Sequence, residues 1–183
     1  MKIINTAIPS VKILEPVVFH DERGFFTEAF RDNWFRSNVA DVTFVQDNLV
    51  RSKRGVLRGM HYQMEQSQGK LIKVTEGEVF DVVIDLRQAS DTYGHWLGVT
   101  LSAQNKRQLW VPEGFAHGYL ALSTHTNLDY RCTNYYHPES EVAIKWDDSD
   151  LAIAWPLETN QKPLLSVKDA CAIPFQLAPK FKC

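Results

Sequence analysis

Glu78-Val79-Phe80-Asp81-Val82-Val83-Ile84-Asp85-Leu86-Arg87 is the stretch of sequence that decides the fold class. Side chains alternate between the two faces of an extended strand, so a period of two separates them into two sets. One face carries Phe80, Val82, Ile84 and Leu86, and the opposite face carries Asp81, Asp85 and Arg87. The alternation predicts a β-strand.

The strand pattern continues beyond this stretch, at residues 96–102, 107–111, 117–123 and 126–132. Pairs such as Glu76-Gly77 and Tyr93-Gly94 mark turns between these segments. Helical signals are limited to residues 32–38 and a turn after Ser166. Many short strands with few helices predict an all-β fold, a sandwich or a jelly-roll barrel. No repeat or linker divides the chain, so we expect one domain over residues 1–183.

Composition excludes several classes of protein. The chain has 183 residues and a formal net charge of −2, without the basic excess of a general nucleic-acid-binding protein. No apolar run approaches the roughly 20 residues that span a bilayer. The three cysteines, Cys132, Cys171 and Cys183, are odd in number and widely spaced. We therefore expect reduced thiols in a cytoplasmic protein rather than a disulfide framework or a cysteine-based zinc site.

Two further segments place polar and apolar side chains on one strand face. Residues 44–50 put Gln46 and Asn48 together with Phe44, and residues 70–74 put Lys70 together with Ile72 and Val74. Such polar positions either face solvent on edge strands or line the mouth of a barrel that holds one ligand. The pattern leaves both interpretations open.

Two histidines are close to glycines, in Arg58-Gly59-Met60-His61 and in Gly114-Phe115-Ala116-His117-Gly118. Glycine allows the backbone to approach a ligand, although a core or turn histidine is an equally reasonable interpretation of each. Cupin metal sites pair two histidines at positions i and i+2, but here Gln63 occupies the second position. Because a single imidazole does not hold a transition metal, we expect a site without metal.

Six blocks of sequence, taken in order, carry a resemblance to a known family. They lie at residues 21–28, 44–48, 55–63, 68–82, 112–118 and 166–169, and include Arg58-Gly59-Met60-His61 and Lys168-Asp169. In order and spacing they resemble the dTDP-4-dehydrorhamnose 3,5-epimerases, from about residue 3 to about residue 175. The departures are small: Met60 replaces an expected leucine, and Val142-Ala143 replaces a more basic stretch.

The resemblance implies a cupin-like jelly roll that forms a homodimer, in which an N-terminal segment of one subunit lines the site of the other. It implies inversion of C3 and C5 beside the C4 ketone of a dTDP-linked 4-dehydro-6-deoxyhexose, a step of rhamnose and cell-surface polysaccharide biosynthesis. Neither metal nor nicotinamide takes part in that reaction. The sequence contains no Gly-x-Gly-x-x-Gly fingerprint, which agrees with this implication.

The resemblance assigns four catalytic positions. His61 matches the base that removes the α-proton, and Asp169 matches the carboxylate that orients it. Tyr130 matches the acid on the opposite face, although its spacing alone favours a buried aromatic beside Leu128. Lys70 matches the cation beside the C4 oxygen, whereas most lysines on strands are simply solvated.

The resemblance also assigns the positions that bind substrate. Arg23, Arg58 and Lys168 match contacts to the diphosphate, and His117 matches a contact near the sugar. Contacts to the base, the sugar or the surroundings of the phosphates are assigned to Glu28, Gln46, Asn48 and Glu141. Phe26 and Tyr136 are candidates to stack on the thymine.

Three alternative functions remain open. The chain could be a related epimerase that inverts one carbon only, or a cupin that binds a sugar nucleotide without catalysis. It could also be a metal-dependent cupin oxygenase or isomerase. A pure binding protein has no need of a base, an orienting carboxylate and an opposing acid together, so the four catalytic positions favour an enzyme.

Overall fold

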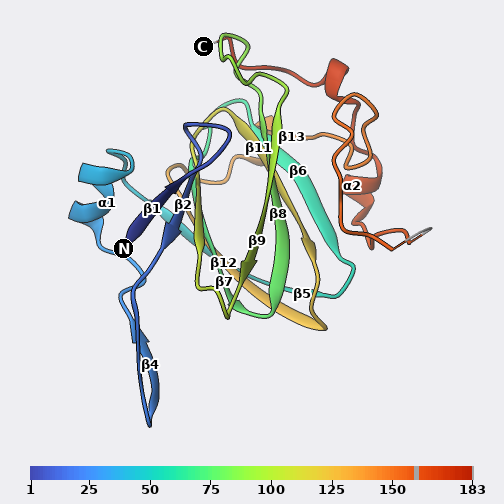
Figure 1. The fold of residues 1–183 in the computed structure, drawn as a ribbon. Helices are drawn as coiled ribbons and strands as arrows, with labels where there is room; N and C mark the ends of the chain where they lie inside the picture. Colours follow the sequence, from blue (N-terminus) through green and yellow to red (C-terminus); the bar gives the residue numbers. More distant parts are fainter. Residues whose placement is uncertain (159–160, 183) are drawn as a thin grey trace.

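Two antiparallel β-sheets packed face to face form the body of the protein (Figure 1). The computed structural model describes residues 1–158 and 161–182. The six-stranded sheet has the order β1 (Lys2–Asn5), β2 (Lys12–Glu15), β10 (Gln108–Val111), β7 (Lys70–Glu76), β12 (His125–Cys132) and β5 (Gln46–Lys53). The five-stranded sheet has the order β13 (Glu141–Ala143), β6 (Leu57–Gln63), β11 (Phe115–Ala121), β8 (Glu78–Asp85) and β9 (Trp96–Ser102). The expected all-β, cupin-like jelly roll is confirmed.

The main core lies between the sheets. Ile72, Leu109 and Leu128 of the six-stranded sheet pack against Val79 and Val83 of the five-stranded sheet. Burial of such side chains stabilises the fold by about 1.5–3 kcal/mol each.

Strand β8 alternates as its sequence predicts, but both of its faces are buried. Asp81 and Asp85 have no exposed surface. The face that carries Val82 and Ile84 points away from the inter-sheet core and is covered by a C-terminal segment that includes Leu151 and Phe175. Sequence patterning cannot show this cover, because the covering residues follow the strand by more than 60 positions.

Two short helices flank the sheets, as the sequence predicts. Helix α1 (Asp32–Asn38) places Phe35 against Leu71 and Trp110 on the outer face of the six-stranded sheet. Helix α2 (Val167–Ala170) lies beside β6, and Ser166 caps it by accepting a hydrogen bond from the Asp169 backbone N–H. Two 3-10 turns, η1 (Pro138–Ser140) and η2 (Phe175–Leu177), complete the elements. No helix in the described residues is long and apolar enough to cross a membrane.

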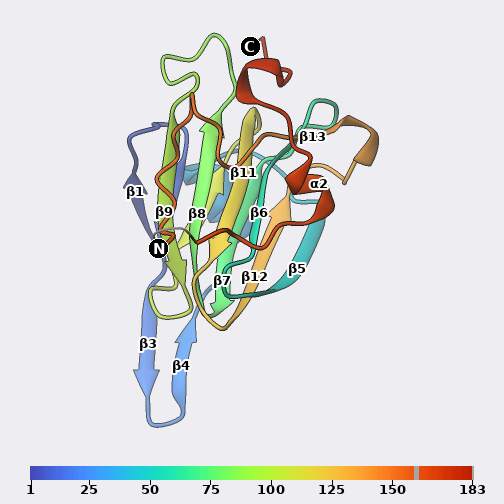
Figure 2. The same cartoon turned by 90° about the vertical axis from the view of Figure 1, so that its right-hand side faces the viewer.

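Strands β3 (Val18–Asp21) and β4 (Gly24–Thr27) form a separate hairpin that projects from one end of the body (Figures 1 and 2). Its aromatic side chains are uncovered by the chain itself: Phe19, Phe25 and Phe26 are 62%, 56% and 70% exposed. The sequence patterns indicated neither this hairpin nor the short strands β1, β2 and β13.

The strand expected at 44–50 begins later than predicted. Strand β5 starts at Gln46, and Phe44 packs with Phe30, Phe35 and Trp110 outside the six-stranded sheet. Phe44 therefore does not share a face with Gln46 and Asn48, because the chain has not yet entered the strand at that position. Strand β11 also differs, since it spans 115–121 instead of 117–123.

Glycines allow β6 and β11 to approach closely next to His61. Gly59 has a φ of +131°, and a Cβ built on it would lie 2.5 Å from the Gly118 Cα. A side chain at position 59 would meet backbone that has no room to move. This approach brings His61 of β6 opposite His117 of β11.

Candidate active site

Two adjoining cavities open between the sheets, with volumes of about 260 and about 190 Å³. Both are lined by His61, Lys70 and Tyr130, which come from β6, β7 and β12. These three side chains belong to both sheets, so the sandwich itself brings them together. They are three of the four catalytic positions assigned from the sequence.

The fourth position, Asp169, contacts the first directly. His61 Nε2 lies 2.5 Å from Asp169 Oδ1, and Ser166 Oγ donates to Asp169 Oδ2 at 2.8 Å. Burial raises the pKa of the Asp169 carboxyl, but the bonds from His61 and Ser166 outweigh it and hold the pKa below its ordinary value. An ionised carboxylate accepts the proton of Nε2, which leaves the lone pair of a neutral imidazole on Nδ1.

Burial shifts the pKa values of Tyr130 and Lys70, the other two positions that the sequence assigned to catalysis. It raises the pKa of Tyr130 to about 12, so the phenol keeps its proton at neutral pH. Burial lowers the pKa of Lys70, and the nearby Cys132, Glu141 and Asp81 oppose that effect. A protonated hydroxyl and a buried lysine side chain thus face one space.

A second histidine–carboxylate pair lies in the same interior. His117 Nε2 is 3.0 and 2.9 Å from the two carboxylate oxygens of Asp81, which has no exposed surface. His117 also lines the smaller cavity. The sequence analysis placed Asp81 on the polar face of its strand and assigned it no function. The one feature that could have drawn attention to it is an acidic residue between apolar neighbours in the strand.

Arg58 also lines the smaller cavity and is held by a buried hydroxyl. Its Nε donates to Ser52 Oγ at 3.2 Å, and Ser52 Oγ lies 2.9 Å from the Tyr119 hydroxyl. Ser52 and Tyr119 are each 4% exposed. Sequence reasoning missed both of these residues, because nothing in a strand pattern shows which hydroxyls face inward.

The larger cavity is lined by four of the predicted binding residues, Gln46, Asn48, Tyr136 and Glu141. Tyr136 donates its hydroxyl to Glu141 Oε2 at 2.6 Å, and Glu141 also forms an ion pair with Lys168. Burial raises the pKa of Glu141, but Lys168 and Tyr136 outweigh it, so the pKa lies below its usual value. Lys168 does not itself line either cavity, but its ion pair with Glu141 holds it next to the larger one.

Three predicted binding residues lie away from these cavities. Arg23 and Phe26 belong to the projecting hairpin, and Glu28 follows it. Arg23 pairs with Asp21 at 2.6 Å, and Glu28 pairs with Arg31 at 2.7 Å. Within one chain, the structure does not bring them to His61.

Gln63, which occupies the second position of the cupin histidine pair, is engaged by backbone. Its amide nitrogen donates to the carbonyls of Gln66 and Tyr135 at 2.9 and 3.2 Å, and its oxygen accepts from the His137 N–H at 3.0 Å. The side chain thus ties two loops to β6. In residues 1–158 and 161–182, no three histidine, cysteine or acidic side chains gather in a way that could hold a metal ion.

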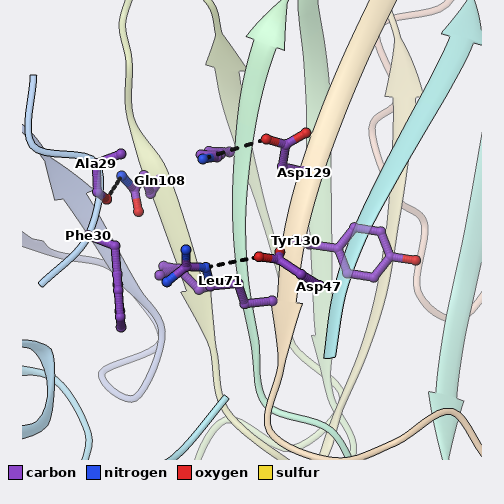
Figure 3. A pocket seen from close by; sticks show the side chains of 9 residues that line it. Ala29, Phe30, Asp47, Leu71, Gln108, Asp129 and Tyr130 are labelled. Atoms are coloured by element: carbon purple, nitrogen blue, oxygen red, sulfur yellow. Dashed lines mark hydrogen bonds and ion pairs between the residues drawn. The ribbon is translucent and has the colours of Figure 1, made fainter. Parts of the chain in front are cut away.

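A further small pocket lies on the outer face of the six-stranded sheet (Figure 3). Its polar groups are paired with one another: Lys73 with Asp129 at 3.5 Å, and Arg131 with Asp47 at 3.4 Å. The ring of Tyr130 points away from this pocket in Figure 3. The outer pocket is therefore separate from the cavities that His61 lines.

Comparisons with known proteins show what the chain is similar to. The family model described as dTDP-4-dehydrorhamnose 3,5-epimerase matches residues 5–176. A relative of that name from Salmonella typhimurium is 55% identical over 174 residues, which are 94% of each chain. One from Neisseria gonorrhoeae is 57% identical over 92% of this chain, which spans about half (51%) of that relative.

A solved structure from Legionella pneumophila is similar over the whole chain. It is a dTDP-6-deoxy-D-glucose-3,5-epimerase in complex with dTDP-4-keto-L-rhamnose. The two are 49% identical with a TM-score of 0.96, and the match covers 100% of this chain and 98% of that one.

Proposed function

We propose that this chain, which belongs to the dTDP-4-dehydrorhamnose 3,5-epimerase family, inverts C3 and C5 of dTDP-4-dehydro-6-deoxyglucose by acid–base enolisation. The product is dTDP-4-dehydrorhamnose. The observation that carries the proposal is the gathering of the His61–Asp169 pair, Lys70 and Tyr130 around one interior space. Inversion beside a ketone needs a base, an opposing acid and a cation for the enolate oxygen, and this set supplies all three.

His61 is the base. Its Nε2 is committed to Asp169, so Nδ1 takes the proton from the carbon next to the ketone. The electron pair of the C–H bond moves into an enolate, and the ionised Asp169 stabilises the imidazolium that forms. Asp169 acts through His61, which makes it a positioning residue for the base.

Tyr130 and Lys70 complete each inversion. Lys70, in its ammonium form, stabilises the negative charge on the C4 oxygen of the enolate. Tyr130 returns a proton to the carbon from the face opposite His61, and the resulting phenolate and imidazolium exchange protons with solvent before the next step. The same pair acts at C5 and at C3, because both carbons flank one ketone.

We place the nucleotide at the edges of the two cavities that His61 lines. Arg58 and Lys168 bind the diphosphate, Tyr136 stacks on the thymine, and His117 contacts the sugar. Gln46, Asn48 and Glu141 supply polar contacts from the larger cavity.

The hairpin residues act in a second copy of the chain. A two-stranded hairpin with exposed aromatic side chains is marginally stable by itself, so a covering partner is favoured. We assign Arg23, Phe26 and Glu28 to the site of the other subunit of a homodimer, consistent with their distance from His61 in one chain.

Mixing two inactive variants tests this assignment. His61→Asn retains an intact hairpin, and the double variant Arg23→Ala/Phe26→Ala retains an intact pocket. After subunit exchange, mixed dimers should combine one intact pocket with one intact hairpin and regain activity. A fully active monomer in light scattering, or no recovery in the mixture, would rule out the shared site.

Conversion of dTDP-4-dehydro-6-deoxyglucose in excess EDTA tests the reaction and the absence of a metal together. We expect the dialysed protein to form dTDP-4-dehydrorhamnose at the same rate with and without the chelator, because His61 has no second imidazole at position 63. Proton NMR of the product measures both inversions. Activity that EDTA removes and iron or zinc restores would contradict the proposal, and a product inverted at one carbon would identify a one-carbon epimerase.

We also propose that residues 1–183 form one domain that works in the cytoplasm, in the rhamnose branch of cell-surface polysaccharide synthesis. The main core draws on both sheets, which supports one folding unit. Cys132 and Cys171 carry free thiols, as a reducing compartment favours, and Cys183 lies outside the described residues.

A further inference from the structure

Ser52 is a buried polar side chain that the mechanism leaves unused. It lies on β5 and is 4% exposed. Its hydroxyl accepts from Arg58 Nε at 3.2 Å and lies 2.9 Å from the hydroxyl of Tyr119. A serine hydroxyl has one donor and two acceptor positions, so it can make both contacts at once.

Arg58 differs from the other two cations assigned to the diphosphate. Arg23 pairs with Asp21, and Lys168 pairs with Glu141. Within residues 1–158 and 161–182, Arg58 has no carboxylate partner: its Nε donates to Ser52, and its guanidinium also lies against the Tyr119 hydroxyl. The positive charge of Arg58 is therefore not neutralised by an acid, and it lines the smaller cavity, where an anion can bind it.

We propose that Ser52 is a positioning residue that orients the Arg58 guanidinium toward the diphosphate of the nucleotide sugar. An arginine loses rotational freedom when it binds a phosphate, and part of that loss is avoided when the free protein already holds the group. Holding Nε sets the plane of the guanidinium, and thus the direction of both Nη groups. Tyr119 fixes the serine hydroxyl in turn. This inference rests on the proposed function.

Calorimetric titration with dTDP tests the inference on the Ser52→Ala variant. We expect dTDP to bind about tenfold more weakly, because Arg58 is no longer oriented in advance. Thymidine, which has no phosphate, should bind as it does to the unchanged protein. In turnover, KM should rise while kcat stays within about twofold, since the contact is made equally in ground and transition states. Ser52→Thr, which keeps the hydroxyl, should restore most of the dTDP affinity.

Two further variants separate positioning from a general effect on folding. In an Arg58→Ala background, Ser52→Ala should weaken dTDP binding no further, because the group that it orients is gone. Ser102→Ala is the matched control: Ser102 is also a buried strand serine, and its hydroxyl accepts from the Asn105 N–H at 3.0 Å. That variant should bind dTDP normally. Ser52→Cys, with a much weaker acceptor, repeats the test if the alanine variant does not fold.

The outcomes distinguish this inference from the function on which it rests. Unchanged dTDP affinity in Ser52→Ala, or a full additional loss in the Arg58→Ala background, would overturn the positioning role alone. A parallel loss of thymidine binding would also overturn it, because the phosphate would not be the group affected. If the unchanged protein binds no dTDP, the proposed function fails and this inference fails with it.

Discussion

Asparagine at position 61 should stop both inversion and proton exchange at C3 and C5. The side chain has no lone pair basic enough to take a proton, so no enolate forms and no later step can occur. We expect turnover to fall by at least the roughly 10²–10⁴-fold that one acid–base group contributes. Proton NMR in deuterated water measures both losses, because each exchanged carbon loses its proton signal.

A matched variant controls for the loss of a histidine as such. His125 is exposed at the start of β12, and His125→Asn should leave exchange and inversion unchanged. Retention of exchange in His61→Asn would assign the base elsewhere. His117, paired with Asp81 in the same interior, would then be the residue to examine.

Phenylalanine at position 130 should separate exchange from inversion. His61 can still remove the proton, exchange it with solvent and return a deuteron to the same face, while the opposite face has lost its donor. Substrate should therefore gain deuterium at C3 or C5 with its configuration retained. Net epimerisation should fall by roughly 10²–10⁴-fold.

The surroundings of the other tyrosines supply the controls. Tyr135 is 62% exposed, so Tyr135→Phe should be neutral. Tyr119, which is buried, is the other tyrosine that lines the smaller cavity, and its hydroxyl contacts that of Ser52. If Tyr130→Phe inverted the substrate at a near-normal rate, or lost exchange together with inversion, Tyr130 would not be the opposing acid. Tyr119 would then be tested in its place.

The alternation of strand residues predicted most of the longer strands of the two sheets, because each of those strands buries at least one face. It could not show that the second face of β8 is also buried, since the cover comes from residues far along the chain, such as Leu151 and Phe175. It also missed the hairpin at 18–27. That hairpin buries no core face within the chain, and a period of two is visible only where one face is buried.

The catalytic positions are beyond the reach of spacing alone. His61 and Asp169 are 108 residues apart in sequence, and only the packing of α2 beside β6 joins them. The family resemblance assigned both to catalysis, together with Lys70 and Tyr130. It did not indicate the partners that hold these side chains, such as Ser166 for Asp169, because those contacts depend on local geometry.

The most direct test of the account follows proton exchange and configuration together in deuterated water, for the unchanged protein, His61→Asn and Tyr130→Phe side by side. We expect deuterium with inversion at both carbons for the unchanged protein, neither for His61→Asn, and deuterium without inversion for Tyr130→Phe. Equal loss of exchange and inversion in both variants would contradict a base and an acid on opposite faces of the sugar.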